Sequence, residues 1–161
     1  MSEVNGAVDY ALVAFREDGD WQVQDIASPA FESVETLSHA LRQVAGPEGA
    51  VGMVAVDEDF FLLVRVVGAS TRMLLSDFTA ADEWELAASA IEFLHLPMPE
   101  DEDEPAPAGD LDLLGDLGLP AMDLAILLDE PDLYPDDALS DIARRVGFGE
   151  QFDDAVGLTS A

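Results

Sequence analysis

The chain has 161 residues, of which 35 are acidic, six are arginine and none is lysine or cysteine, which gives a formal net charge of −29 at pH 7. The absence of cysteine excludes disulfides, cysteine-ligated zinc and thiol catalysis. The negative field repels phosphate backbones, so we expect no direct binding to nucleic acid, and it suits either a basic partner or simple solubility.

The first two predicted elements form a β-hairpin. Residues 11–15 are apolar, and residues 21–26 alternate apolar with polar side chains. Between them the Asp18-Gly19 pair supplies the positive φ of a tight turn.

A helix is expected after the hairpin. It begins either at Ser28-Pro29 or with Ser33 as its cap, and it ends at Gly46-Pro47. Its apolar residues recur on one face at helical spacing: Val34, Leu37, Ala40, Leu41 and Val44.

Three strands in close succession should form the centre of a sheet. Residues 51–56, 60–67 and 71–76 are rich in Val, Leu and Phe, and short turns separate them, so they predict a β-meander. The first of these turns is Asp57-Glu58-Asp59.

A second helix should follow the meander. Thr79 is the expected N-cap, Asp82 and Glu83 lie in the first turn, where acidic residues are favourable, and Pro97 ends the helix. The stripe expected to be buried consists of Trp84, Ala87, Ala88, Ile91 and Leu94.

The predicted order is ββαβββα, an α+β fold with a five-stranded antiparallel sheet covered by two helices. This order resembles the longin, profilin-like and roadblock groups of small domains. Those folds mostly serve as interaction platforms, and the resemblance concerns architecture only.

Residues 97–109 break the composition with prolines and alternating acids, which should keep them extended as a linker. The hydrophobic period is helical beyond this point. We therefore expect a sheet domain over residues 1–96, a linker over 97–109, and a helical segment over 110–161 that docks on the sheet or on another protein.

Four short helical pieces are expected in the C-terminal segment. The first ends at Gly118, the second runs from Pro120 to Pro131, and the third begins at Pro135 and has Gly147 as its C-cap. The side chains expected to face inward are Leu111, Leu113, Leu114 and Leu117; Met122, Ala125, Ile126 and Leu128; Ala138, Leu139, Ile142, Ala143 and Val146; and Phe148 and Phe152 of the fourth piece.

The sequence contains no pattern typical of an active site. His39 lies beside the apolar stripe of the first helix and His95 at the end of the second, where an imidazole suits the helix dipole. There is no Gly-rich phosphate loop, and with two histidines and no cysteine the chain cannot itself be a zinc nucleobase deaminase. We expect no catalytic, cofactor-binding or metal-binding residues.

The candidates for binding a partner lie at the first turn of the meander. Asp57, Glu58 and Asp59 are expected in a solvated turn, although three acids could also be half of a carboxylate metal site. Phe60 and Phe61 point to opposite faces of their strand, so one should reach the core and the other a helix or a partner, for which we favour Phe61.

Six segments in order carry a family resemblance: DYALVAFREDGDWQV, VDEDFFLLVRV, MLLSDFTAA, the acidic break, GDLDLLGDLGLPAMDLAILLD and DLYPDDALSDIARRVGFGEQFDDAV. Together they resemble the actinobacterial family called tRNA adenosine deaminase-associated proteins. The resemblance implies a link to the deaminase that converts adenosine to inosine at the tRNA wobble position, and it assigns no catalytic residue.

Three functional hypotheses follow. The first is a non-enzymatic acidic adaptor that binds a protein, with a tRNA adenosine deaminase as the candidate partner. The second is a nucleic-acid mimic or electrostatic chaperone for a basic protein, and the third is a carboxylate-based metal-dependent enzyme. The sequence has no apolar run of about 18 residues and no basic signal region, so we expect a cytoplasmic protein without membrane contact. The oligomeric state is left open.

Overall fold

The computed structural model describes most of the chain, in ten stretches: residues 8–17, 19–25, 34–45, 49–56, 60–68, 70–82, 84–97, 100, 106–129 and 135–156. Its elements follow in the order β1 (Val8–Glu17), β2 (Asp20–Asp25), α1 (Val34–Val44), β3 (Ala50–Val56), β4 (Phe60–Val67), β5 (Ser70–Leu75), η2 (Phe78–Asp82), α2 (Glu85–Phe93), β6 (Ala108–Gly109), η3 (Gly115–Leu117), α3 (Ala121–Leu128), α4 (Pro135–Val146) and α5 (Gly149–Val156).

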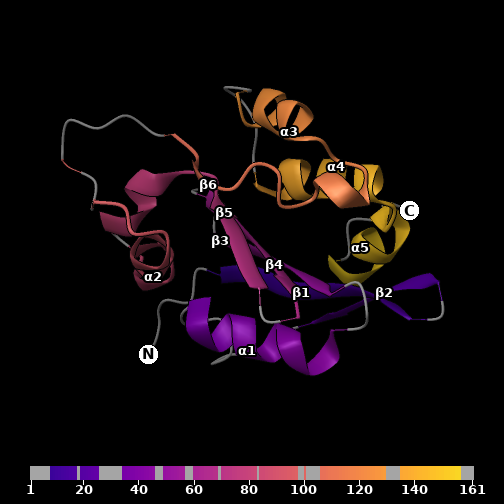
Figure 1. Cartoon of the computed structure of the whole chain (residues 1–161). Helices are drawn as coiled ribbons and strands as arrows, with labels where there is room; N and C mark the ends of the chain where they lie inside the picture. Colours follow the sequence, from indigo (N-terminus) through magenta and orange to yellow (C-terminus); the bar gives the residue numbers. More distant parts are fainter. Residues whose placement is uncertain are drawn as a thin grey trace.

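One antiparallel sheet organises the molecule, with strand order β2-β1-β3-β4-β5-β6 (Figure 1). The predicted hairpin and meander are present, and the α+β class is confirmed. The described residues form six strands, so the prediction of a five-stranded sheet was wrong by one. The extra strand, β6, consists of two residues from the end of the predicted linker, and it pairs Gly109 with Leu74 and Ala108 with Leu75. Gly109 has a φ of 123°, and a Cβ there would collide with the Met73 carbonyl, so glycine is required at this edge.

Helices α1 and α2 cover one face of the sheet, as predicted. Leu37 and Leu41 of α1 and Ile91 of α2 are fully buried against alternate residues of β4, such as Leu62 and Val64. This pattern follows from the period of two along a strand, which directs every second side chain to the same face.

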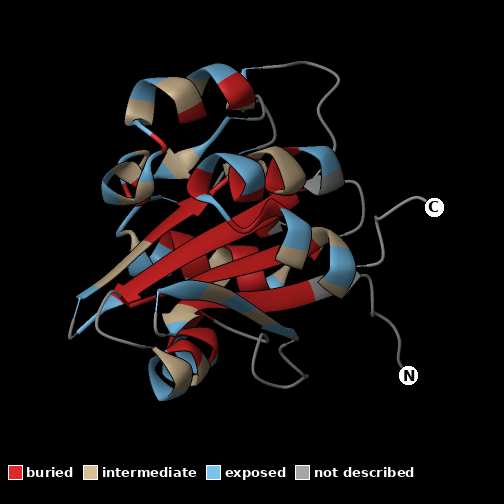
Figure 2. Ribbon diagram, turned by 90° about the vertical axis from the view of Figure 1, so that its right-hand side faces the viewer, coloured by how far each residue is buried: buried red, intermediate tan, exposed pale blue. Residues whose placement is uncertain are grey.

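The C-terminal helices cover the other face, so the sheet is the middle of three layers. Figure 2 shows the buried strands between α1 on one side and the C-terminal helices on the other. Helix α4 packs over β3 and β4, and α5 packs over β2. The shared core joins both predicted parts of the chain; its members from the sheet are Leu12, Ala14, Val51, Met53, Ala55, Phe61, Leu63 and Leu74. The division into a 1–96 domain and a separate 110–161 segment stays a prediction.

The predicted cap of the second helix was wrong. Residues Phe78–Asp82 form a 3-10 helix, and α2 begins only at Glu85. The N-cap of α2 is Trp84, which makes no side-chain cap bond. The Asp77 carboxylate instead caps the 3-10 helix, because it accepts bonds from the Thr79 amide at 2.9 Å and from the Thr79 hydroxyl at 2.6 Å. Trp84 precedes α2, and its half-buried ring packs against the core with its centroid 6.2 Å from that of Phe60.

Helix α2 ends in a Schellman motif at a residue other than glycine. The Leu96 amide donates to the Ile91 carbonyl and the His95 amide to the Glu92 carbonyl, both at 3.1 Å. This geometry places His95 at a φ of 60°, in the left-handed region that glycine usually occupies.

The C-terminal segment is partly as predicted. All five residues expected on the apolar face of α4 are buried, as are Phe148 and Phe152, and Gly147 ends α4 with a φ of 122°. Two expectations were wrong. The piece around residues 111–117 is turns and a single 3-10 helix, and α3 buries Leu124 and Leu127 while it exposes Met122 and Ile126. None of the helices that the structure describes is long and apolar enough to cross a bilayer.

Candidate functional site

The structure describes only one of the four residues favoured for partner binding. Asp57, Glu58 and Asp59 lie outside the described residues. Phe61 is 3% exposed and packs in the core beneath the C-terminal helices. It therefore points to a helix, one of its two predicted destinations, and an external partner does not reach it in this arrangement. Phe60 faces the opposite core, as expected for its neighbour in the strand.

The two histidines occupy surface positions. His39 is exposed on α1, and its ring Nε2 lies 2.9 Å from Nε2 of Gln43. His95 is exposed at the end of α2. Within the stretches that the structure describes, no group of three or more His, Cys, Asp or Glu side chains is arranged to hold a metal ion.

A buried arginine, which the sequence analysis did not select, joins the sheet to the C-terminal segment. Arg65 lies on β4, on the same face as Phe61 and Leu63, and it is only 3% exposed. A guanidinium in such surroundings needs strong partners. Its Nη1 donates to Asp116 Oδ1 at 2.8 Å and to the Leu113 carbonyl at 3.1 Å, and its Nη2 donates to Asp116 Oδ2 at 3.1 Å. The bidentate bonds from Arg65 hold the pKa of Asp116 below its usual value, against the smaller opposing effect of partial burial.

A second arginine lies beside the first on the neighbouring strand. Arg72 of β5 is the Cα partner of Arg65, and it donates to Asp110 at 2.5 Å and lies 3.8 Å from Asp112. Burial acts to raise the pKa of Asp110, but the bonds from Arg72 and from the Asp112 amide outweigh it, so the pKa is lowered. Both arginines therefore bind the start of the C-terminal segment to the sheet.

In the cluster formed by the two arginines and Asp110, Asp112 and Asp116, all side chains except Asp110 border an open cleft of about 360 Å³, together with Val67 and Ser70. Two arginines and three aspartates give the cluster one net negative charge, so it has no positive excess to offer a phosphate group. The charged groups that line the cleft already pair with one another. We interpret the cluster as a structural clamp between sheet and C-terminal segment.

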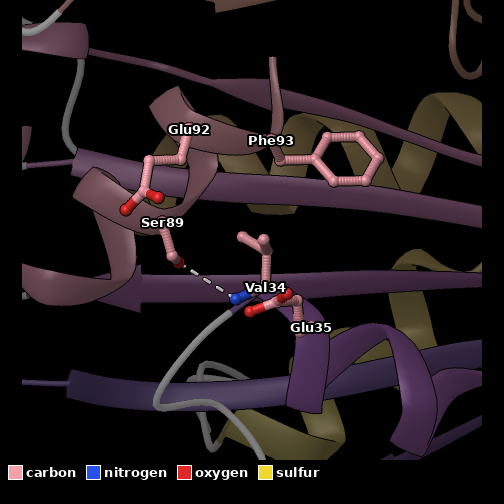
Figure 3. A pocket seen from close by; sticks show the side chains of 5 residues that line it. All are labelled: Val34, Glu35, Ser89, Glu92 and Phe93. Atoms are coloured by element: carbon pink, nitrogen blue, oxygen red, sulfur yellow. Dashed lines mark hydrogen bonds between the residues drawn. The ribbon is translucent and has the colours of Figure 1, made fainter. Parts of the chain in front are cut away.

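A smaller cleft of about 200 Å³ lies between α1 and α2 and contains a serine (Figure 3). Ser89 Oγ accepts a bond from the Val34 amide at 3.0 Å and donates to the Leu86 carbonyl at 2.7 Å. The ring of Phe93 points away from this serine. Because both hydrogen-bonding roles of the hydroxyl are used, Ser89 acts as a cap for the first turn of α1 and not as an activated nucleophile.

All six arginines lie in described parts of the chain, and each has a partner within it. Four of them pair with aspartates, namely Arg65, Arg72, Arg144 and Arg145. Arg42 donates to the Thr71 hydroxyl, and Arg16 lies over the Trp21 ring, 5.0 Å from its centroid. The cations that a nucleic-acid site would need are thus already engaged.

The largest exposed apolar side chains lie on α3. Met122 is 74% exposed and Ile126 is 64% exposed, and they are neighbours because residues four apart share a helix face. The half-exposed Asp123 is on the same helix, and the exposed Asp129 is at its C-cap. We call these four residues the α3 surface.

The described residues define a class of protein: an acidic α+β protein with ion pairs in one of the two clefts above, a helix cap in the other, and an apolar spot on helix α3. A family model described as "Rv3753c-like tRNA adenosine deaminase-associated protein" matches residues 9–149, and the chain belongs to that family. This confirms the resemblance found in the sequence. A relative, "Protein Rv3753c" of Mycobacterium tuberculosis (strain ATCC 25618 / H37Rv), is 38% identical over 145 residues, which cover 88% of this chain and 84% of the relative. No solved structure matches the chain.

Proposed function

We propose that this protein is a non-catalytic acidic accessory protein that binds a tRNA adenosine deaminase in the cytoplasm. The family description supports this proposal because it associates the family with such a deaminase and does not call its members deaminases. The two clefts described above support it as well, since Ser89 is used as a cap and Arg65 and Arg72 are used in ion pairs.

The observation that carries the proposal is the imbalance between the many acidic residues and the few arginines, which are all engaged. The chain has 35 acidic residues, and its six arginines all have partners inside the molecule. A protein with this surface charge repels tRNA and attracts a basic protein. An enzyme that acts on tRNA must present a cationic surface to the phosphate backbone, so a deaminase of this kind is a complementary partner.

The same charge also fits a mimic, which would occupy the RNA-binding surface itself. An adaptor and a mimic differ in one measurable respect. An adaptor permits deaminase, tRNA and this protein to form a ternary complex, whereas a mimic excludes tRNA. The third hypothesis, a metal-dependent enzyme, gains no ligand set from the described residues.

Sedimentation velocity with fluorescent tRNA tests the proposal. We expect that adding this protein to the deaminase–tRNA complex makes the labelled tRNA sediment faster, as a ternary complex. Release of free tRNA would identify a mimic. Poly-glutamate of equal total charge is the control for unspecific competition. If this protein changes neither the complex nor the free deaminase, the proposal is wrong.

A further inference from the structure

Helix α3 has too much apolar surface for the contacts that it makes. Seven of its eight residues, AMDLAILL, are apolar. Leu124 and Leu127 are buried, and α3 packs against α4. A helix that is apolar all round is normally buried on all sides, yet α3 is the outermost helix of its layer (Figure 1).

The uncovered part is a compact spot and not a scatter of single residues. Met122 and Ile126 stand one turn apart and are 74% and 64% exposed, more than any other large apolar side chain of the described chain. Val67, Phe93 and Leu96 each reach only 40%. Contiguous exposed apolar surface with a polar border is typical of protein–protein contact sites.

Two carboxylates lie at the border of this spot. The Asp123 side chain is 47% exposed, and its carboxylate lies 3.9 Å from Arg145, while Asp129 is exposed at the C-cap of α3. A central apolar anchor within a charged rim is the usual anatomy of a binding hot spot. Methionine suits such a position because its flexible thioether adapts to an irregular pocket.

We propose that the α3 surface is the contact site for a protein partner that offers an apolar pocket bordered by lysine or arginine. This inference rests on the proposed function, and it assigns the deaminase-binding contact to Met122 and Ile126. The charge selects this occupant over a second copy of the chain, because two molecules of charge −29 repel one another and would bring Asp123 and Asp129 against like charges. The same charge opposes contact with an anionic lipid surface.

The test compares two double variants of the full chain for binding to purified tRNA adenosine deaminase by titration calorimetry. Met122→Ser with Ile126→Ser removes the anchor. Phe93→Ser with Leu96→Ser is the matched control, since it removes two exposed apolar side chains at the C-terminal end of α2 and just beyond it. We expect the α3 variant to bind at least about tenfold more weakly and the control to bind within about twofold of wild type, as is usual for hot-spot and peripheral residues respectively. Both variants should keep the wild-type far-UV spectrum and a melting temperature within a few degrees, because the replaced side chains are exposed.

Each outcome is decisive. If the α3 variant binds as tightly as wild type, this assignment is overturned while the proposed function stands. If the wild-type protein itself does not bind the deaminase, the proposed function is wrong, and so is the assignment of the deaminase to the α3 surface. If wild type sediments as a dimer that the α3 variant disperses, the occupant is a second copy, which also overturns the inference. As a further measurement, Asp129→Asn should reduce the salt dependence of binding, because it removes one charge from the rim.

Discussion

The clamp formed by Arg65 predicts an asymmetric double-mutant cycle. Asp116→Asn removes the charge that pairs with a buried guanidinium, whereas Arg65→Met replaces that guanidinium with an apolar side chain about as long as the aliphatic part of arginine. Removing one partner of a buried pair costs more than removing both, because the remaining charge stays in an apolar environment. The double variant should therefore be more stable than Asp116→Asn alone.

The magnitude follows from the exposure of the two side chains. Arg65 is 3% exposed and Asp116 is 64% exposed, so solvent screens the carboxylate but reaches little of the guanidinium. Hydrogen bonds to charged groups contribute about 1.5–3 kcal/mol each, and screening at Asp116 reduces the total for its two bonds to about 2 kcal/mol. The bond from Arg65 to the Leu113 carbonyl remains in the Asp116→Asn variant.

Thermal unfolding followed by circular dichroism measures the effect. For a chain of this length, a loss of about 2 kcal/mol lowers Tm by roughly 4–8 °C. We expect this drop for Asp116→Asn and a partial recovery when Arg65→Met is added. An unchanged Tm in Asp116→Asn, or additive losses in the double variant, would refute the view that this pair clamps the C-terminal segment to the sheet.

Four further outcomes are expected. The folded-state pKa values of Asp110 and Asp116 lie below their unfolded values of about 3.9. The two carboxylates therefore stabilise the fold above that pH, and this stabilisation is lost as the pH falls through the folded-state values. The Tm difference between wild type and Asp116→Asn should shrink between pH 6 and pH 3. His95→Gly should raise stability by about 0.5–1 kcal/mol in urea unfolding because it removes left-handed strain, and a lower midpoint would contradict this. Trp84→Ala should cost about 2–4 kcal/mol, somewhat less than for a fully buried tryptophan, and an unaltered Tm would show that the ring is not a core anchor. The fragment 1–96 should keep a cooperative thermal transition but self-associate in light scattering, because eight core residues of the sheet are no longer covered by the C-terminal helices. A non-cooperative thermal transition would show that the C-terminal helices are part of the folding unit.

The strands and α4 were predictable because their patterns are unambiguous. Alternation in β2 indicates a strand, and the apolar runs of the meander are short and bounded by turns, which favours strands over helices. The apolar residues of α4 fall on one narrow face between charged ones. The placement of Val34, Leu37 and Leu41 towards the sheet follows from the same periodicity.

The phase of α3 was not predictable in this way. Seven apolar residues in eight give no polar face, so the periodicity does not indicate which side of the helix is covered. The prediction that Met122 and Ile126 face inward was wrong because tertiary packing leaves them outside. Strand β6 is too short for any alternation, and it exists because Ala108 and Gly109 meet the open edge of β5.

The sequence carries a signal for the clamp. Arg65 interrupts the apolar strand FFLLVRVV, and a charged residue on a strand face that is otherwise buried must have a partner. The identity of that partner was beyond sequence reasoning, because Asp116 lies 51 residues away and is one of many aspartates in the acidic C-terminal segment.

Titration of purified tRNA adenosine deaminase with the wild-type protein at low and at physiological salt tests the central claim most directly. The account predicts saturable binding at both concentrations, with a weaker affinity at the higher salt because exposed charges are screened beyond about 8 Å at physiological ionic strength. The apolar contribution of Met122 and Ile126 should preserve measurable binding there. Absence of heat and of complex formation at both salt concentrations would contradict the claim that this acidic protein is a direct partner of the deaminase.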